Sequence, residues 1–256
     1  MYRFLLRPRW LVFHLLVAAG VVVMINLAFW QLRRHDERRA FNAVVTERID
    51  QAPVPLDDLL PSDLGLDLAP GDEPAAGDPL AGLEWRPVEV TGEYLADEQV
   101  TVFNRSQGGR AGDLVVTPMR LADGRVLLVA RGFVPLDTAV GPPPPGDVAA
   151  RGRLRATQER RRGQLTDTGS GELTELQRLD IARLAAQLPG PVVPMYMELT
   201  TSDPAAAAGT YPVPVSPPEL TAGPHLSYAV QWSIFALAAV AGWVFAVRKS
   251  LRSRTS

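Results

Sequence analysis

The chain has 256 residues, a formal net charge of -2 and no cysteine. A charge this close to neutral gives no reason to expect nucleic-acid binding, and the lack of cysteine excludes disulfides, thiolate zinc sites and cysteine-based copper transfer. The length is sufficient for one domain with a hydrophobic core, besides two long apolar segments near the ends.

The first apolar segment, residues 10–30, follows a short basic tail at residues 1–9. It contains no charged side chain, and its length of about 20 residues matches a hydrocarbon core about 30 Å thick. It is longer than the apolar region of a signal peptide, and it ends in the bulky pair Phe29-Trp30 instead of a small-residue cleavage site. We therefore predict an uncleaved transmembrane helix over 10–30, which continues as a helix beyond the membrane.

The second apolar segment, residues 228–247, precedes another basic tail at residues 248–256. The two tails together hold seven Lys and Arg side chains and no acidic one. Short basic flanks favour the cytoplasmic side. We predict a multi-pass protein of the cell membrane, taken to be a bacterial plasma membrane, with both termini cytoplasmic. Residues 31–227 are then an extracytoplasmic domain.

The extracytoplasmic region begins with an insert at residues 51–82 that is rich in Pro, Gly and Asp. This composition predicts a loop, partly disordered, in which Leu59, Leu60 and Leu64 could dock locally. Short apolar runs between turn residues predict strands farther along the chain. They cover residues 86–94, 99–104, 114–121, 125–135, 148–156 and 192–200. Asp123-Gly124 favours a hairpin between two of them, and the continuous apolar run at 126–129 predicts a strand covered on both faces.

One amphipathic helix is expected in the extracytoplasmic domain, at residues 174–188. Thr174 and Gln177 fit a capping box, apolar side chains recur on one face, and Pro189-Gly190 would end the helix. The predicted fold class is an α+β membrane protein. Two transmembrane helices, one at each end, bracket a mostly antiparallel β domain with one amphipathic helix.

Catalytic motifs are missing from the sequence. It has no nucleophile elbow, phosphate-binding loop or zinc-protease helix, and its three histidines are dispersed. We therefore predict no catalytic residue and a protein that is not an enzyme.

Histidines beside the two spans are the candidate ligand-binding residues. His35 and His225 follow and precede the spans on the extracytoplasmic side, whereas His14 lies inside the first span. Imidazole is a good axial ligand for haem iron, and a lipophilic haem favours the membrane boundary. An interfacial histidine can also simply lie at headgroup level, and the residues leave both roles open. His225, Tyr228 and Trp232 share one helix face and form the candidate haem site, with His35 as a weaker second ligand.

The chain resembles the Surfeit locus protein 1 family in four motifs, which occur in the family's order over essentially the whole sequence. Residues 112–118 (GDLVVTP) look like its G-x-x-V-V-T-P strand, and residues 129–135 (VARGFVP) are similar to its V-N-R-G-[FW]-V-P run. His225-Leu226-Ser227-Tyr228 with Trp232 matches its H-L-x-Y-x-x-x-W start of the second span. The fourth motif consists of Trp30, Gln31 and Arg34 at the end of the first span. Within the strand motifs, the family positions are Gly112, Thr117, Pro118, Arg131 and Gly132. Ala130 departs from the family's Asn, and the insert at 51–82 is not part of the pattern.

This resemblance implies an assembly factor, or chaperone, for haem–copper cytochrome c oxidase in respiratory-chain biogenesis. Such a protein assists haem a insertion into the core subunit, so the implied partners are that subunit, the haem a synthesis machinery and the membrane. The resemblance also implies transient haem a binding, with His225 as the ligand of the haem iron. The alternative function is a membrane-anchored extracytoplasmic sensor or scaffold that binds a ligand or a partner protein. The short tails offer little with which to relay a signal.

Overall fold

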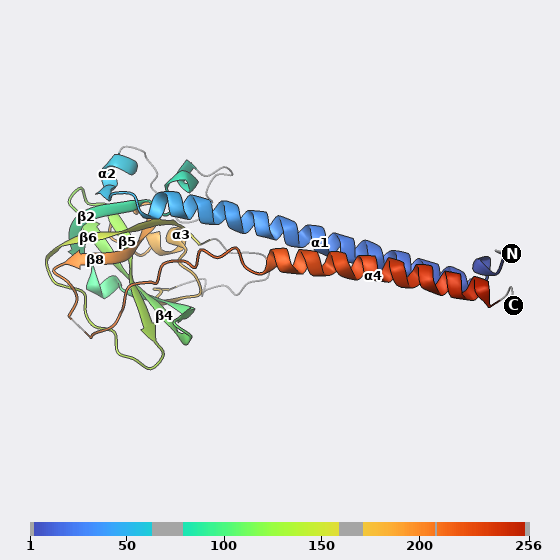
Figure 1. Ribbon diagram of the computed structural model, residues 1–256. Coiled ribbons are helices and arrows are strands. Elements are labelled where there is room, and N and C mark those ends of the chain that lie inside the picture. The colour runs from blue at the N-terminus through green and yellow to red at the C-terminus, as the bar shows by residue number, and fades with distance from the viewer. Residues whose placement is uncertain (1–2, 63–78, 159–170, 208, 254–256) are drawn as a thin grey trace. The chain divides into compact units, whose positions relative to one another are not determined.

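The computed structural model describes residues 3–62, 79–158, 171–207 and 209–253. The chain divides into two compact units. One consists of Met1–Thr46 and Glu219–Ser256, and the other of Glu47–Pro218. The first is helical and the second contains the β-sheet (Figure 1).

The helical unit is built from α1 (Pro8–Ile49) and α4 (His225–Arg252), with a short 3-10 helix, η1 (Arg3–Leu6), before α1. The two long helices run antiparallel, so both termini lie at one end of the pair (Figure 1). Both are long and apolar enough to span a membrane. The 42 residues of α1 extend about 63 Å, twice the thickness of a hydrocarbon core. The predicted helical continuation beyond Trp30 is therefore confirmed.

Small residues form the contact between α1 and α4. Ala28, Ala229 and Ala236 are buried, whereas Leu237 and Phe245 remain about 70% exposed. Small side chains allow two helix backbones to approach closely in lipid, and large apolar side chains then face the acyl chains. This distribution agrees with the length and apolar composition that would allow both helices to span a membrane.

The β unit contains eight strands in one mixed sheet. They are β1 (Val54–Pro55), β2 (Pro87–Tyr94), β3 (Val100–Gln107), β4 (Arg110–Leu121), β5 (Val126–Pro135), β6 (Asp147–Ala156), β7 (Glu175–Leu176) and β8 (Met195–Asp203). The shorter elements are α2 (Leu56–Leu59), η3 (Pro79–Leu83), η4 (Ala96–Glu98) and α3 (Ile181–Ala185). The strand order in the sheet is β1-β2-β6-β8-β5-β4-β3-β7. Because β2 also pairs with β4, the strands β2, β6, β8, β5 and β4 close into a ring.

The sheet is mixed, and most of its pairings are antiparallel, as expected; the parallel pairs were not predicted. The pairs β1–β2, β3–β7 and β5–β8 are parallel, and the others are antiparallel. Parallel neighbours need a long connection, and about 60 residues separate the end of β5 from the start of β8. Local strand propensity does not show which two strands a long connection will bring side by side.

Strand β5 lies at the centre of the core, as its apolar run predicts. All ten of its residues are buried. Leu127 and Val129 pack in one hydrophobic cluster, while Leu128 and Ala130 pack in a second cluster on the other face. The prediction of a strand covered on both faces is confirmed.

The described part of the insert docks onto the first cluster. Leu56 and Leu60 are buried there and Leu59 packs against them, which confirms local docking, while Leu64 lies outside the described residues. The guanidinium of Arg125 donates to the carbonyl oxygen of Leu60 at 2.7 Å. Burial of these leucines and this hydrogen bond order the segment around α2, which composition alone had assigned to a loop.

The predicted helix at 174–188 is wrong in extent and in its cap. Glu175–Leu176 is strand β7, and the helix is only α3, whose N-cap Asp180 accepts a hydrogen bond from the Arg183 amide. The backbone amide of Thr101 donates to the Thr174 carbonyl oxygen at 2.9 Å. Pairing with β3 therefore outweighs the helical periodicity. Leu173 and Leu176 reach the second cluster from an extended segment, whereas Ile181 and Leu184 reach it from α3.

Gly132 occupies a backbone position that only glycine fits. Its φ is +145°, and a Cβ there would overlap the carbonyl oxygen of Val213. Phe133 and Val213 exchange two backbone hydrogen bonds of 2.7 and 2.9 Å. This pairing holds the segment near Val213 directly against β5 and leaves no room for a side chain.

We expect Gly132→Ala to lower the free energy of unfolding of the β unit by about 3 kcal/mol or more, because strain and overlap add. Gly82→Ala is the matched control, since a Cβ at Gly82 would meet nothing within 4 Å. Guanidinium unfolding of the full-length protein, followed by tryptophan fluorescence, measures the difference. Equal unfolding midpoints for the two variants would contradict the close approach of Val213.

Candidate functional site

The predicted ligand His225 is held by a residue of the other long helix. Its Nδ1 lies 2.8 Å from Oε1 of Gln31. His225 is the first residue of α4, and Gln31 lies within α1 just after Trp30. With the amide oxygen of Gln31 as acceptor, Nδ1 carries a proton, so in the neutral ring Nε2 keeps its lone pair. This arrangement orients the imidazole and presents Nε2 as a potential metal ligand.

Gly223 leaves space beside that free nitrogen. A Cβ at position 223 would lie 3.3 Å from Cδ2 and 3.4 Å from Nε2 of His225. The φ of Gly223 is +68°, which side chains rarely adopt. A glycine here thus makes the turn into α4 and keeps the Nε2 edge of the ring uncrowded.

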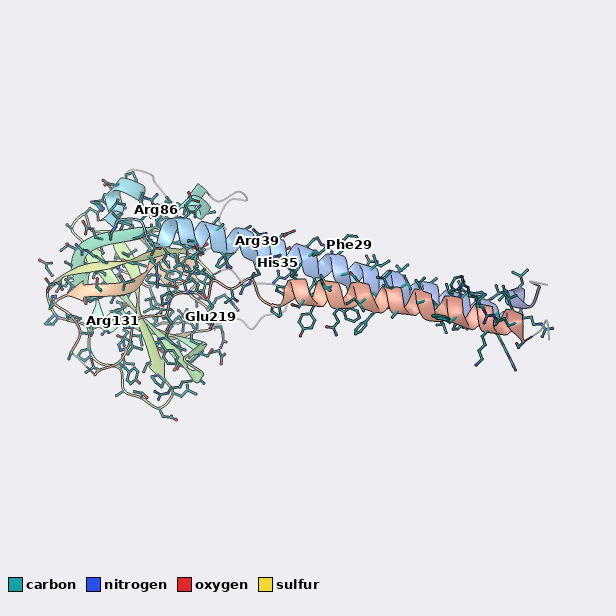
Figure 2. The ribbon with its side chains drawn as sticks, viewed as in Figure 1. Phe29, His35, Arg39, Arg86, Arg131 and Glu219 are labelled. Carbon is teal, nitrogen blue, oxygen red and sulfur yellow. The ribbon has the colours of Figure 1, made fainter. Side chains whose placement is uncertain are left out.

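His35 lies one helical turn beyond Gln31 on α1, about 6 Å farther along the axis. Figure 2 labels it beside the start of α4. Its Nδ1 is buried and has no hydrogen-bond partner among the described residues. A buried imidazole nitrogen without a partner is costly, so it marks a place where a bound group could supply one. Its role as a second ligand remains a prediction.

Tyr228 and Trp232 lie on the same side of α4 as His225, as their spacing requires. Tyr228 is 47% exposed. Trp232 packs edge-on against Phe235, with ring centroids 5.9 Å apart. The structure therefore joins His225 to Gln31 and leaves the two aromatic side chains beside that pair as an apolar face.

His14 has a different environment from the other two histidines. Its Nδ1 accepts a hydrogen bond of 2.8 Å from the indole Nε1 of Trp243. The rings of Trp10 and Trp243 lie 5.6 and 5.7 Å from the imidazole. This interhelical hydrogen bond satisfies a polar group inside the apolar pair, so His14 has a structural explanation.

Two of the family-motif residues in the strands, Thr117 and Arg131, meet at one glutamine. The side chains of both donate to Oε1 of Gln99, each at 3.0 Å. Arg131 also donates to the carbonyl oxygens of Gly141 and Pro142, at 3.1 and 3.0 Å. Arg131 is only 4% exposed, and burial lowers the pKa of its guanidinium from the ordinary value. These contacts tie β5 to the proline-rich loop, so the motif is structural.

Gln99 was missed by the sequence reasoning, because a single polar residue before a strand carries no distinctive signal. The remaining motif positions have different surroundings. Gly112 lies against β5, where a Cβ would overlap the Val134 carbonyl oxygen, and Pro118 pairs with Leu128. Arg34 forms an exposed ion pair of 2.6 Å with Glu37, and Trp30 is 46% exposed.

A buried charged network crosses the outer side of β6 and β8. Arg155 bridges Glu198 and Glu84 at 2.6 and 3.1 Å, and its guanidinium lies 3.7 Å from the ring centroid of Trp85. Burial raises the pKa of Glu198, and the charge of Arg155 opposes that rise. A carboxylate paired this closely stabilises the domain and is not available as a general base.

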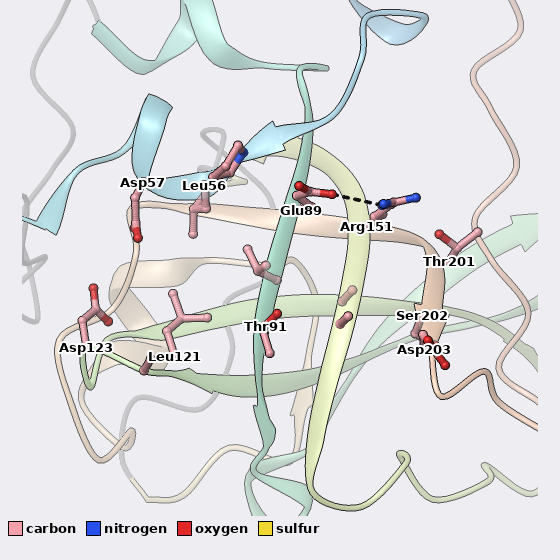
Figure 3. Close-up of a pocket in the computed structure, with 15 residues that line it drawn as sticks. Leu56, Asp57, Glu89, Thr91, Leu121, Asp123, Arg151, Thr201, Ser202 and Asp203 are labelled. Carbon is pink, nitrogen blue, oxygen red and sulfur yellow. Dashed lines mark hydrogen bonds and ion pairs between the residues drawn. The ribbon is translucent and has the colours of Figure 1, made fainter.

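A groove of about 680 Å³ lies in the β unit, and Figure 3 shows the side chains that line it. Its charged groups are largely engaged with other side chains. Glu89 pairs with Arg151 at 3.2 Å, and Arg125 binds both Asp57 and Asp123. Across residues 3–62, 79–158, 171–207 and 209–253, no three His, Asp or Glu side chains cluster as a metal site. The groove thus contains no recognisable catalytic arrangement.

Comparison with known proteins places these residues in a family context. The SURF1 family profile matches residues 18–237, which include most of α1, the first half of α4 and the eight described strands. An uncharacterised SURF1-like protein of Mycobacterium bovis is 30% identical over 257 residues, covering 98% of this chain and 88% of the relative. A SURF1-like protein of Monosiga brevicollis is 28% identical over 244 residues, covering 89% and 85%. One of Rickettsia felis is 25% identical over 122 residues, covering 47% and 45%.

Arg131→Lys is expected to lower the free energy of unfolding by about 1–3 kcal/mol, because a single ammonium cannot serve Gln99 and two buried carbonyl oxygens together. Arg151→Lys is the matched control, since the Arg151 side chain is 63% exposed and makes a surface ion pair. The control should change stability by less than about 0.5 kcal/mol. Guanidinium unfolding of both full-length variants makes the comparison, and an Arg131→Lys midpoint no lower than that of the control would count against the network.

Proposed function

Because the chain belongs to the SURF1 family, whose members are assembly factors for cytochrome oxidase, we propose that it assists haem a insertion into the core subunit of that enzyme. The proposal makes haem a a transient cargo of this protein. It also makes the oxidase core subunit and the haem a synthesis machinery its partners. The protein itself carries out no catalytic step.

The observation that carries the proposal is the contact between His225 and Gln31. Histidines that ligate metals generally donate their other ring N–H to a neighbouring oxygen, which fixes the tautomer and the ring orientation. Gln31 offers such an oxygen at 2.8 Å. Gly223 leaves the Nε2 side of the ring uncrowded. The residues present therefore fit an axial ligand of haem iron.

The surroundings of His225 suit an apolar cargo that must later be released. Tyr228 and Trp232 supply aromatic surface beside the imidazole, and haem a would bring an iron that accepts the Nε2 lone pair. One neutral histidine with one amide partner forms a modest attachment. A receiving subunit with its own ligands could displace it, which suits a carrier better than a permanent haem protein.

His225→Ala is expected to abolish haem a binding while leaving the protein folded and inserted, because an interfacial imidazole contributes little to packing. Gln31→Leu should weaken binding by about 10–100-fold, as loss of the hydrogen-bond partner of a ligating histidine does at metal sites. Asn26→Leu is the matched control, because the Asn26 amide bonds only its own helix at the Val22 carbonyl oxygen.

The measurement is the Soret spectrum of each full-length variant, purified after co-expression with haem a synthesis. Retention of haem a by His225→Ala with an unchanged Soret band would exclude direct ligation. The residues around His225 and Gln31 would then be a candidate docking surface for the oxidase subunit.

We also propose that both termini are cytoplasmic and that the β unit is extracytoplasmic. The support is the basic composition of the two tails, which the positive-inside rule associates with the cytoplasm. With this orientation, the β unit and His225 would both lie on the extracytoplasmic side, where we propose that the core subunit receives haem.

The chain has no cysteine, so single introduced cysteines report sidedness without background. Ser253→Cys should resist an impermeant maleimide added to intact cells, whereas Asp97→Cys, at an exposed position of η4, should react. Permeabilised cells should label both. Labelling of Ser253→Cys from outside would reverse the proposed orientation.

A further inference from the structure

A narrow apolar groove of about 380 Å³ runs along the seam between α1 and α4. Its lining is Val21, Ile25, Ala28, Phe29 and Leu32 from α1, and Ser233, Ala236, Leu237 and Val240 from α4. Ser233 is the one polar residue in this lining, and its hydroxyl donates to the Ala229 carbonyl oxygen of its own helix at 2.9 Å. The groove therefore presents hydrocarbon and no free hydrogen-bonding group to an occupant.

The groove lies on the same helix pair as the contact between His225 and Gln31 and extends toward it on α1. On α1, Leu32 follows Gln31 directly and Ala28 lies one turn before it. On α4, Ser233 lies two turns after His225 and on the same face. One end of the groove thus points toward the proposed iron ligand, and the other end lies farther along the helix pair.

Its proportions favour a chain over a ring. The lining on α1 extends from Leu32 to Val21, about 16 Å along the axis at the helical rise. The alanines Ala28 and Ala236 create the gap, because neighbouring helices pack at about 8–10 Å and larger side chains would fill it. An apolar groove of about 380 Å³ spread over this length suits an extended isoprenoid chain better than a planar macrocycle.

We infer that this groove is the subsite for the farnesyl tail of haem a. The inference rests on the proposed function, because it takes His225 as the iron ligand. A haem anchored at His225 lies at the one end of the groove where its hydrocarbon tail can follow the seam. The tail subsite gives the protein a means to distinguish a farnesylated haem from haem b, which lacks the tail but has the same iron chemistry.

The test compares haem o with haem b, because haem o has the farnesyl tail without the formyl group of haem a. Each is titrated into the purified full-length protein in lipid nanodiscs, with the Soret shift as readout. The native sequence should bind haem o at least about tenfold more tightly than haem b, the discrimination that apolar pockets give for extra hydrocarbon. Ser233→Leu fills the groove and should remove that preference while leaving the haem b affinity unchanged.

Ala238→Leu is the matched control, since Ala238 is exposed and outside the groove lining, and it should keep the preference. Equal affinities of the native sequence for the two haems would overturn the inference and leave the groove to phospholipid acyl chains. Ser233→Leu weakening both haems alike would overturn it too, because the groove would then support the ring or the fold. In both cases, a Soret shift with haem b that depends on His225 would still support His225 as the iron ligand. No His225-dependent binding of either haem would defeat the proposed function itself.

Discussion

Close packing of α1 against α4 is the constraint on which the candidate site depends. Inside a bilayer the hydrophobic effect cannot hold two apolar helices together, because lipid tails are as apolar as leucine. The pair instead relies on the small residues Ala28, Ala229 and Ala236 and on two interhelical hydrogen bonds. Gln31 meets His225 at one place and Trp243 meets His14 at the other. Hydrogen bonds of this kind contribute about 0.6 kcal/mol on average, so both are needed mainly to set register.

That register decides the chemistry of His225. A shift of α4 by a single residue would rotate the imidazole by about 100° and separate it from Gln31. The ring would then lose the oxygen that fixes its tautomer and exposes Nε2. The groove beside it depends on the same alignment, since it exists only where small residues on both helices meet. One packing arrangement thus produces both the oriented imidazole and the apolar groove along the same helix pair.

The β unit solves a different problem, which is stability without disulfides. Its sheet closes through the pairing of β2 with β4, and β5 packs into hydrophobic clusters on both faces. Buried polar groups are satisfied inside the sheet, where Gln99 serves Thr117 and Arg131. The family motifs therefore divide by physical role. Those in the strands maintain the fold, whereas Gln31 and His225 form the pair that we propose for ligand binding.

The sequence alone determined the features that depend on local pattern. Apolar length gave the two long helices, the continuous apolar run gave the buried strand β5, and Asp123-Gly124 gave its hairpin, because each follows from residues close together in the chain. Spacing also placed His225, Tyr228 and Trp232 on one face. Tertiary structure decided what distant residues do to one another. It paired β5 with β8 in parallel, drew Glu175–Leu176 into a strand despite a helical pattern, and joined Gln31 to His225 across 194 positions. Such contacts are selected by the packing of the whole chain, and no local periodicity encodes them.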